Sequence, residues 1–541
     1  MLYLDVQKKS DGSIVRLIYR YETQEEYSLL SGMAGMTHKK GNIMTSTADW
    51  YNVYQIVNYY GDRNCKLSDD CYKWLMSLWK KHDDIIFMKY TGTNLRIEGL
   101  YDYQNSDVAI MKKAERLINA NEMGLGKTIE TIKATENDRK TLIVCPKSVM
   151  KNWYNEITKW TDKKATIIEG SKERKLAQLN NQKWADYIIV NYALIREGTP
   201  YVKNLENKFF DSIIFDEAHR LKSRRSLQFK GAKNLKSKNL YLLTGSPIMN
   251  HPHELWCLLH LIDPVRFNAY WNFVGRFCEL RESYFSPAPE IVGVKNEDVL
   301  KDILQSMMIR HNKKEVLDQL PDKHYKFIEL PLEGELKKLY KQLDKINEFT
   351  YNGRTFSASS ELHKLIMQRQ LCLSPNIFDD EKEYIDQKTQ FILDTIEDSN
   401  SKIVVFSTSK KYIDVLESIL NKRNIPYKAL TGATKDRQEV IDTFTTNDTY
   451  RLFLGTIQAG GEGINLQVAD TLIFTDKMWS PAMNDQAEAR IHRIGQKNNV
   501  NIISLGIEGT VDYYVEKVLT EKKDIISKVM FYDILSCEMK K

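Results

Sequence analysis

Residues 121–128 read NEMGLGKT, and this stretch decides the predicted fold. It follows a short apolar run at Leu117 and Ile118, and it opens a stretch with helical spacing at Ile129 and Ile132. A strand, a glycine-rich loop and a helix in this order are the framework of a phosphate-binding loop. The segment therefore predicts a nucleotide site in an α/β fold.

Each residue type in this loop suits a nucleotide phosphate. Gly124 and Gly126 let backbone N–H groups turn toward phosphate oxygens, and the helix that follows presents its positive end to the anion. Lys127 supplies a positive charge to the β and γ phosphates, and the Thr128 hydroxyl suits Mg²⁺. Asn121 departs from the strict pattern, which has glycine there, so a chance turn is the alternative for this segment taken alone. The predicted ATP-contacting loop comprises Met123, Gly124, Leu125, Gly126, Lys127 and Thr128.

A pair of acids follows an apolar run further along the chain, in FDEAH at 215–219. The run Ile213–Phe215 predicts a buried strand that ends in these acids. Asp216 would hold Mg²⁺ through water, and Glu217 would orient or deprotonate the attacking water. A solvated acidic turn, the alternative, does not explain why an apolar strand leads into the two carboxylates.

Two arginines three positions apart stand in RIHRIG at 490–495. On a helix, residues three apart share a face, so Arg490 and Arg493 would point at one phosphate. Arginine side chains in that place stabilise the charge of a phosphoryl group in transfer. An ordinary surface pair is the alternative, and the spacing leaves both interpretations open.

Working outward, apolar runs alternate with helical stretches in two blocks, which predicts buried parallel strands. We expect an α/β unit over 96–255, a mostly helical segment over 256–385, and a second α/β unit over 386–541. The predicted strands are TLIVC (141–145), DYIIVNY (186–192), SIIFDE (212–217), LYLLTGS (240–246), KIVVFST (402–408), PYKAL (426–430), RLFLGT (451–456), TLIFTD (471–476) and VNIISL (500–505).

Residues 1–95 carry no chemical motif and predict a small α/β accessory domain with tryptophans in its core. Strands are expected at Ser13–Tyr19 and Asn94–Gly99, and amphipathic helices at Trp50–Tyr60 and Ser68–Lys81. DNA binding by this segment is the alternative interpretation.

The composition of the 541 residues, 42% hydrophobic and 28% charged, is that of a globular protein. No apolar run reaches the roughly 18 residues of a membrane span, and the N-terminus has no signal-peptide pattern. Seven cysteines without a CxxC pair favour reduced thiols in an intracellular protein rather than a zinc site. Abundant Lys, Asn, Ile and Tyr suggest an AT-rich bacterial or phage source, in which the protein would be cytoplasmic.

Residues 220–238, RLKSRRSLQFKGAKNLKSK, carry eight lysines or arginines and no acid, within a chain whose net charge is +6. Such a patch binds DNA phosphates without reading sequence. A solvated helix face is the alternative, although the position directly after the acidic pair favours DNA. The candidate contacts are Lys222, Arg224 and Arg225.

Taken together, these segments resemble the Swi/Snf family of ATP-dependent DNA translocases in helicase superfamily two. The resemblance runs from about residue 98 to 515, and the family's loop usually begins with Asp where this chain has Asn121. The segments that carry it are LYDYQ (100–104), NEMGLGKT (121–128), TLIVCPKSVMKNWYNEITKW (141–160), DEAHRLKS (216–223), LLTGSPIMN (242–250), VVFST (404–408), GTIQAGGEGINLQVADTLIFTD (455–476) and QAEARIHRIGQ (486–496).

The resemblance implies two RecA-like lobes with ATP in the cleft between them. It implies that Gln104 reads adenine, and that Arg490 and Arg493 reach the nucleotide from lobe two. The family often has two arginines where this chain has Arg310 and His311, which puts a brace between the lobes in doubt. Further residues implied to contact ATP are Gly463 and Gln486, and those implied to contact DNA are Ser407, Thr456, the Gly460–Gly463 turn, Trp479 and Pro481; for Trp479, packing within lobe two is the alternative.

The resulting hypothesis is a monomeric motor that uses ATP and Mg²⁺ to move along double-stranded or branched DNA without sequence preference. Its short length and N-terminal segment suggest, by analogy, the annealing and fork-remodelling subgroup. Two alternatives remain: a strand-separating helicase, and a DNA-binding scaffold whose ATP site is only structural. The complete set of Lys127, Asp216, Glu217, Arg490 and Arg493 argues against the scaffold.

Overall fold

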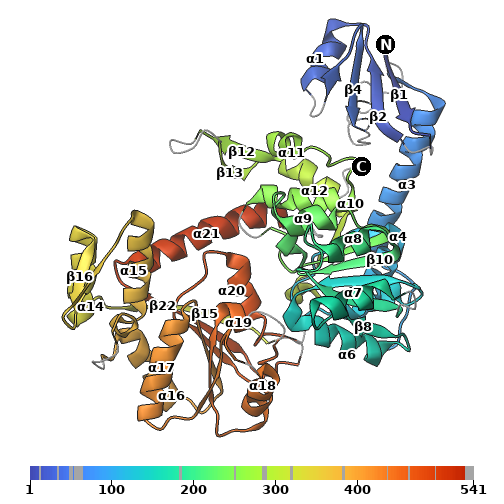
Figure 1. The fold of residues 1–541 in the computed structure, drawn as a ribbon. Coiled ribbons are helices and arrows are strands. Elements are labelled where there is room, and N and C mark those ends of the chain that lie inside the picture. Colours follow the sequence, from blue (N-terminus) through green and yellow to red (C-terminus); the bar gives the residue numbers. More distant parts are fainter. Residues whose placement is uncertain are drawn as a thin grey trace. The chain divides into compact units, whose positions relative to one another are not determined.

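The computed structural model describes residues 1–10, 14–32, 36–47, 53, 56, 65–181, 185–248, 251–282, 289–316, 321–379, 384–434, 436–460, 464–493 and 495–530. The chain divides into two compact units, each described here by itself (Figure 1). The first unit comprises Met1–Glu122, Gly126–His311 and Ile525–Lys541, and the second comprises Met123–Leu125 and Asn312–Asp524.

The chain begins with a five-stranded sheet in the order β3-β4-β2-β1-β5. Leu2, Leu4, Leu17 and Tyr19 alternate along two antiparallel strands and fill the core beneath the sheet. The strand predicted near Ser13–Tyr19 is confirmed as β2, whereas the helix predicted at 50–60 lies outside the described residues except for positions 53 and 56. The elements are β1 (Leu2–Lys8), β2 (Ile14–Arg20), α1 (Gln24–Gly32), β3 (Thr37–His38), β4 (Ile43–Thr47) and β5 (Cys65–Leu67).

A long helix, α3 (Asp69–Thr91), leads from this sheet toward the next. Ser68 caps it by accepting a hydrogen bond from the Cys71 N–H, and the helix is longer than the sequence pattern predicted. The strand expected at Asn94–Gly99 is wrong, because these residues form turns and irregular backbone. The Ile97 N–H donates to the Asn105 side chain at 2.8 Å and is therefore not available to a strand partner.

A seven-stranded, wholly parallel sheet forms the centre of the first unit, in the order β14-β6-β11-β10-β7-β9-β8. Its central strand segments are buried on both faces, which is why stretches such as Leu142–Cys145 and Ile213–Phe215 are apolar runs. The four strands predicted in this unit are confirmed. The strands are β6 (Arg116–Asn119), β7 (Thr141–Cys145), β8 (Ala165–Ile167), β9 (Tyr187–Asn191), β10 (Phe209–Asp216), β11 (Lys236–Leu243) and β14 (Met308–Ile309).

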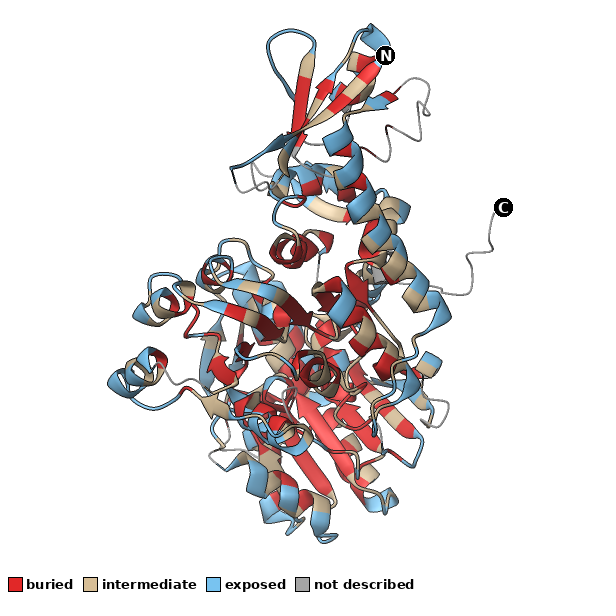
Figure 2. Cartoon of the chain, turned by 90° about the vertical axis from the view of Figure 1, so that its right-hand side faces the viewer, coloured by how far each residue is buried: buried red, intermediate tan, exposed pale blue. Residues whose placement is uncertain are grey.

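Helices cover this sheet, and Figure 2 shows buried residues concentrated along central strands and exposed ones on outer helical faces. The helices are α4 (Asp102–Ala114), α5 (Lys127–Thr135), α6 (Met150–Trp160), α7 (Lys172–Asn180), α8 (Pro200–Glu206), α9 (Leu227–Ala232), α10 (Leu255–Ile262), α11 (Tyr270–Phe277) and α12 (Glu297–Gln305), with a hairpin of β12 (Cys278–Arg281) and β13 (Glu290–Val294).

The second unit contains a six-stranded parallel sheet in the order β15-β22-β21-β18-β20-β19. The five strands predicted there are confirmed, and so is an α/β class with two parallel-sheet lobes. Its elements are α13 (Lys313–Val316), β15 (Lys323–Leu330), α14 (Gly334–Ile346), β16 (Glu348–Tyr351), β17 (Arg354–Ser357), α15 (Glu361–Leu373), α16 (Gln387–Asp398), β18 (Ile403–Ser407), α17 (Lys410–Lys422), β19 (Tyr427–Leu430), α18 (Arg437–Thr446), β20 (Leu452–Thr456), α19 (Ile457–Gly460), β21 (Thr471–Phe474), α20 (Pro481–Glu488), β22 (Val500–Ile507) and α21 (Val511–Met530).

The stretch 256–385 differs from the helical segment that the sequence predicted. It contributes β14 to the first parallel sheet and β15 to the second, and it also forms two hairpins. The division between the units falls after His311, within the segment 256–385. Among the described helices, none has the length and apolar character needed to cross a membrane.

Candidate nucleotide and nucleic-acid site

The glycine-rich loop lies between β6 and α5, as predicted, and its two glycines have the backbone that the loop needs. Gly124 and Gly126 have φ angles of 88° and 90°, a region that favours glycine. A Cβ added at Gly126 would lie 2.2 Å from Gln104 Nε2, so the glutamine packs directly against the loop. Gln104 Oε1 also accepts a hydrogen bond from the Tyr101 N–H at 3.0 Å. The structure thus brings Gln104 to the predicted loop.

The ammonium group of Lys127 is held by its own loop. Nζ donates to the carbonyl oxygens of Asn121 at 2.6 Å and Glu122 at 3.3 Å. Burial lowers the pKa of Lys127, and the carboxylates of Glu217 and Asp216 act against this shift. The lysine and the two predicted catalytic acids therefore share one electrostatic site.

The acid pair lies at the carboxyl end of β10, where its geometry is fixed from several sides. Trp153 Nε1 donates to Asp216 Oδ2 at 2.8 Å, and the Tyr192 hydroxyl donates to the Asp216 carbonyl at 2.7 Å. Glu217 has a φ of 52°, which is uncommon for a residue other than glycine, and it lies 3.3 Å from His219 Nδ1. Strand end and turn together hold the two carboxylates side by side.

The charge of this pair fits a divalent cation. Burial, and next the neighbouring Glu217, raise the pKa of Asp216 to about 6, while Trp153 and Lys127 lower it. Two carboxylates confined in a buried site repel one another, and a cation such as Mg²⁺ relieves that repulsion. The half-buried Thr128 at the start of α5 supplies the hydroxyl of the predicted set. The residues present therefore fit Mg²⁺.

Sequence reasoning missed a buried polar cluster behind the loop. Asn121 Nδ2 donates to Asp107 Oδ2 at 2.7 Å and to Glu130 Oε2 at 3.2 Å. Asn121 Oδ1 accepts from the His311 N–H at 2.9 Å, and His311 Nε2 lies 3.0 Å from Asp107 Oδ1. Burial, and next Asp107, raise the pKa of Glu130 well above its ordinary value. The signal in the sequence was Asn121 itself, since an amide suits a place between two carboxyl groups.

The two arginines of the second unit do not stand on a helix, so that part of the prediction is wrong. Helix α20 ends at Glu488, and Arg490 and Arg493 lie in the turns that follow. The turn is fixed because Gln496 Nε2 donates to the carbonyl oxygens of Gln467 at 3.0 Å and Ala469 at 2.8 Å.

Gln486 has the feature expected of a ligand contact. Its side chain is only 3% exposed, and among the described residues Nε2 has no hydrogen-bond partner. A buried donor left unpaired costs about 1–3 kcal/mol, which a ligand oxygen would recover. Gly463, the other predicted ATP contact of this unit, lies outside the described residues.

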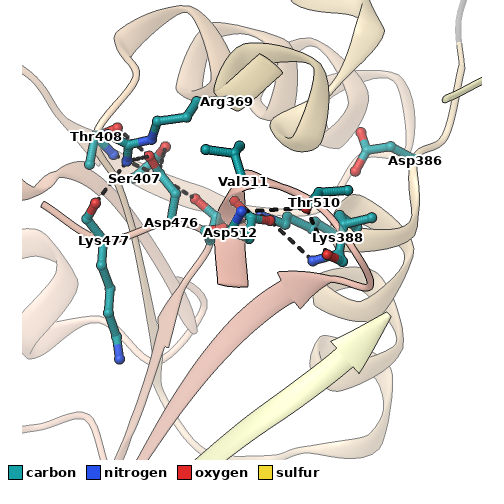
Figure 3. Close-up of polar contacts among 12 residues, drawn as sticks. Arg369, Asp386, Lys388, Ser407, Thr408, Asp476, Lys477, Thr510, Val511 and Asp512 are labelled. Atoms are coloured by element: carbon teal, nitrogen blue, oxygen red, sulfur yellow. Dashed lines mark hydrogen bonds and ion pairs between the residues drawn. The ribbon is translucent and has the colours of Figure 1, made fainter. Parts of the chain in front are cut away.

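Ser407, which the resemblance implied to contact the DNA backbone, has a fully buried side chain. Its hydroxyl donates to Asp476 Oδ1 at 2.9 Å, and the Thr408 N–H donates to the same oxygen at 2.9 Å (Figure 3). Arg369 binds the other carboxylate oxygen at 3.0 Å. Asp476 thus organises the ends of β18 and β21, and the Ser407 hydroxyl takes part in this arrangement.

Thr456 and Trp479, two further predicted DNA contacts of this unit, also engage their own lobe. Thr456 is 9% exposed, and its Oγ1 accepts from the Ala459 N–H at 3.3 Å in the short helix α19. Trp479 is half-buried, with the Arg369 guanidinium 5.3 Å from its ring centre and the Tyr514 ring at 5.9 Å. These contacts are the ones expected if Trp479 packs within its own lobe, which was the alternative interpretation of this residue.

The basic stretch of the first unit is partly neutralised by acids from elsewhere in the chain. Lys222 Nζ lies 2.9 Å from Glu254 Oε1, whereas Arg225 is exposed. The Arg224 guanidinium lies 4.4 Å from the ring centre of Tyr270 and 5.8 Å from that of Trp271, whose side chain is 57% exposed. Arg224 and Arg225 are therefore stronger candidates for DNA contact than Lys222.

A glycine-rich loop before a helix, an acidic strand end and a pair of arginines, distributed over two parallel-sheet units, are typical of two-lobed P-loop proteins. Residues 69–377 match the model of the SNF2-related domain, and residues 387–495 match that of the helicase conserved C-terminal domain. The chain belongs to the SNF2-related family.

Several known proteins are similar to this chain. The ISWI chromatin-remodeling complex ATPase ISW1 of Saccharomyces cerevisiae is 32% identical over 448 residues, which cover 77% of this chain and 39% of that protein. The human SWI/SNF-related matrix-associated actin-dependent regulator of chromatin subfamily A member 1 is 30% identical over 451 residues, covering 76% of this chain and 42% of that protein. The chain thus spans about two fifths of the length of these relatives.

Among solved structures, the SWI2/SNF2 ATPase core of Sulfolobus solfataricus in complex with double-stranded DNA is similar to this chain. It has 24% identity, covers 81% of this chain and 94% of that one, and gives a TM-score of 0.39.

Proposed function

We propose that the chain is a DNA-dependent ATPase that hydrolyses ATP to ADP and phosphate and moves along double-stranded or branched DNA without reading sequence. The observation that carries the proposal is the gathering of Lys127, Asp216 and Glu217 beside a glycine-rich loop at the carboxyl ends of parallel strands. Membership of the SNF2-related family supports the same activity. Two relatives carry the printed names of a chromatin-remodeling ATPase and a probable ATP-dependent DNA helicase.

In this proposal each residue of the first unit has a distinct task. Gln104 contacts the adenine, and Lys127 leaves its two loop carbonyls to bind the phosphates. Glu217 accepts a proton from the attacking water, and the strained backbone at this residue holds its carboxylate beside Asp216. Thr128 and Asp216 would hold Mg²⁺, partly through water, and the bound cation would neutralise charge that develops on the phosphates.

The second unit supplies the residues that make hydrolysis drive movement. Arg490 and Arg493 contact the γ phosphate, and Gln486 donates its unpaired N–H to the nucleotide. ATP that is held by both units favours a closed arrangement, and hydrolysis removes that preference. If both units hold the same DNA, each cycle advances the protein along it.

The decisive experiment measures ATP turnover with and without duplex DNA in the parent chain and in Lys127→Ala and Glu217→Gln variants. We expect DNA to stimulate the parent, and both variants to lose turnover while keeping the parent's thermal melt. Lys172→Ala, an exposed lysine of α7, serves as the control and should keep full activity. Turnover that survives in either catalytic-site variant contradicts the assigned roles.

Movement is separated from the two alternatives by the choice of substrate. A duplex translocase displaces the third strand of a triplex, whereas a strand-separating helicase also releases a strand from a forked duplex. A scaffold binds DNA and ATP but gives no turnover on duplex, single-stranded or forked DNA. Triplex displacement that depends on Lys127 supports the proposal, and its absence from an ATPase-active parent contradicts translocation.

A further inference from the structure

The N-terminal sheet lies before the first residue matched by the SNF2-related domain, and one of its faces is not used by the core. Strand pairing sets Tyr3 opposite Lys66 on one side and opposite Arg20 on the other, and Arg20 opposite Ile43. The Lys39 N–H donates to the Ile43 carbonyl at 2.8 Å, so Lys39 continues the line. These five residues form a row that crosses four strands and ends one residue beyond β3, and we call it the basic row.

The basic row points away from the core because side chains alternate along a strand. Leu2 and Leu4, on either side of Tyr3 in the sequence, and Tyr19, next to Arg20, are fully buried beneath the sheet. Lys66, Arg20 and Lys39 are exposed, and the Arg20 guanidinium lies 5.5 Å from the ring centre of Tyr3. The aromatic ring therefore fixes one cation at the centre of the row.

Charge on this part of the chain is separated between its two sides. Arg16, opposite Gln7, adds a further exposed cation to the face that carries the basic row. The acid described on this face is Asp5, whose Oδ1 accepts from Ser68 Oγ at 2.6 Å and from the Val6 N–H at 2.8 Å. Acids of the α1 side are engaged elsewhere, as Glu26 lies 3.2 Å from the amino group of Met1. This face is thus cationic, although residues 1–67 as a whole carry nearly equal numbers of acidic and basic side chains.

We propose that the basic row and Arg16 bind the phosphate backbone of DNA. A polyanion complements this face, and a row that crosses four inter-strand spacings extends over about 19 Å, room for several phosphates. The face presents cations, a tyrosine beneath Arg20, and Ile43, rather than a helix or ribbon shaped for a groove, so binding would not depend on sequence. The inference gives residues 1–67 a role outside the proposed motor, as a second place at which the chain holds the DNA.

The test measures equilibrium binding of the full chain, without nucleotide, to a fluorescent 30-base-pair duplex over a range of salt concentrations. The variant combines Arg20→Ala, Lys39→Ala and Lys66→Ala. Each phosphate contact contributes about 0.9 to the magnitude of the slope of log affinity against log salt. Loss of the three contacts should therefore reduce that magnitude by about 2.7. A matched control combines Lys9→Ala, Lys73→Ala and Lys80→Ala, exposed lysines outside the basic row, and should keep the parent's slope.

A second variant keeps the charge, with Arg20→Lys, Lys39→Arg and Lys66→Arg, and should bind as the parent does. An unchanged slope in the neutralised variant, or an equal fall in the control, overturns the inference. The result is separable from the motor, because the neutralised variant should keep full ATP turnover at saturating DNA. If the parent shows no DNA-stimulated turnover but its salt slope still depends on the basic row, the proposed motor activity is contradicted and the inference about the basic row stands.

Discussion

The contacts of Asn121 explain why this loop begins with an amide where the resembling family usually has an acid. Its NH₂ group serves two buried carboxyl groups, Asp107 and Glu130, while its oxygen accepts from His311. Aspartate at this position would bring a third carboxylate into the cluster and would remove both donated hydrogen bonds. His311, where the resembling family often has arginine, completes the cluster from the end of the Gly126–His311 segment of the first unit.

We expect Asn121→Asp to lower the free energy of unfolding by about 1–3 kcal/mol, since buried carboxyl oxygens lose their donor. The same change should weaken ATP binding, because a new carboxyl group in the cluster would displace the residue whose main-chain carbonyl positions Lys127. Denaturant unfolding and nucleotide titration measure the two effects. Asn272→Asp, at an exposed position of α11, is the control, and equal stability of both variants would contradict the role of the cluster.

Lys89 gives a prediction about pH. Its ammonium donates to the carbonyl oxygens of Gln305 and Met308, and burial lowers its pKa from 10.5 to about 8. Since the unfolded chain then holds this proton over a range in which the folded chain has lost it, the Lys89 contribution to stability rises with pH between about 8 and 10.5. A cavity of about 80 Å³ adjoins this residue.

The measurement compares unfolding of the parent with that of Lys89→Met from pH 7.5 to 10.5. The difference in unfolding free energy between the two proteins should change in the parent's favour as pH rises. The comparison removes the effect of tyrosines and cysteines that titrate in the same range in both proteins. A difference that stays constant over this interval contradicts the assignment.

At this scale, the sequence predicted the position of residues well and their exposure poorly. Lys127, Asp216 and Glu217 were predictable because a loop and a strand end placed them at one edge of a sheet. Ser407 was assigned to DNA, yet its hydroxyl binds Asp476, a residue far along the chain. Nothing in the local pattern around Ser407 states that its partner is buried with it.

Among the elements, α16, β21 and α21 are joined by one buried lysine (Figure 3). Lys388 Nζ donates to the Thr475 carbonyl at 2.6 Å and to Asp512 Oδ2 at 2.7 Å. Burial acts to lower the pKa of Lys388, but Asp512 and other neighbours outweigh it and the pKa is raised. The ion pair therefore holds the second sheet to the start of its last helix.

Removing one partner of this ion pair should lower the free energy of unfolding by more than removing both partners. Lys388→Met or Asp512→Asn alone leaves a buried charge or donor unpaired, and we expect each to lower the free energy of unfolding by about 3–5 kcal/mol. The double variant should lose clearly less than the sum of the two. Denaturant unfolding of the four proteins measures this coupling, and additive losses would show that the contact contributes little.

The elements that the sequence failed to predict have physical causes in common. Strand β14 is two residues long, too short for any periodic pattern, and it is specified by its pairing with β6. Strand β15 lies at the edge of its sheet and exposes many of its side chains, so it lacks the apolar run of a central strand. Helix α20 stops at Glu488, and the glutamine contacts that fix the next turn were not visible in the spacing of Arg490 and Arg493.

For the whole molecule, the arginines provide the test of cooperation between the units. Arg490→Ala and Arg493→Ala should each reduce the rate of ATP hydrolysis by roughly 10³–10⁵, since the charge of the transition state loses its partner. ATP affinity should change much less, because Gln104 and Lys127 remain. Arg423→Ala, at an exposed position after α17, is the control. Hydrolysis at the parent's rate in both arginine variants would contradict shared binding of the nucleotide.

The last described helix has a consequence for how the halves stay together. Helix α21 begins in the second unit, but from Ile525 onward it belongs to the first, where Ile525 and Ile526 pack against the apolar core. After a protease cut between His311 and Asn312, the C-terminal fragment would therefore still be bound to the N-terminal fragment through the end of α21. The nicked halves should co-elute until Ile525 and Ile526 are both changed to Asp, when the fragments should part.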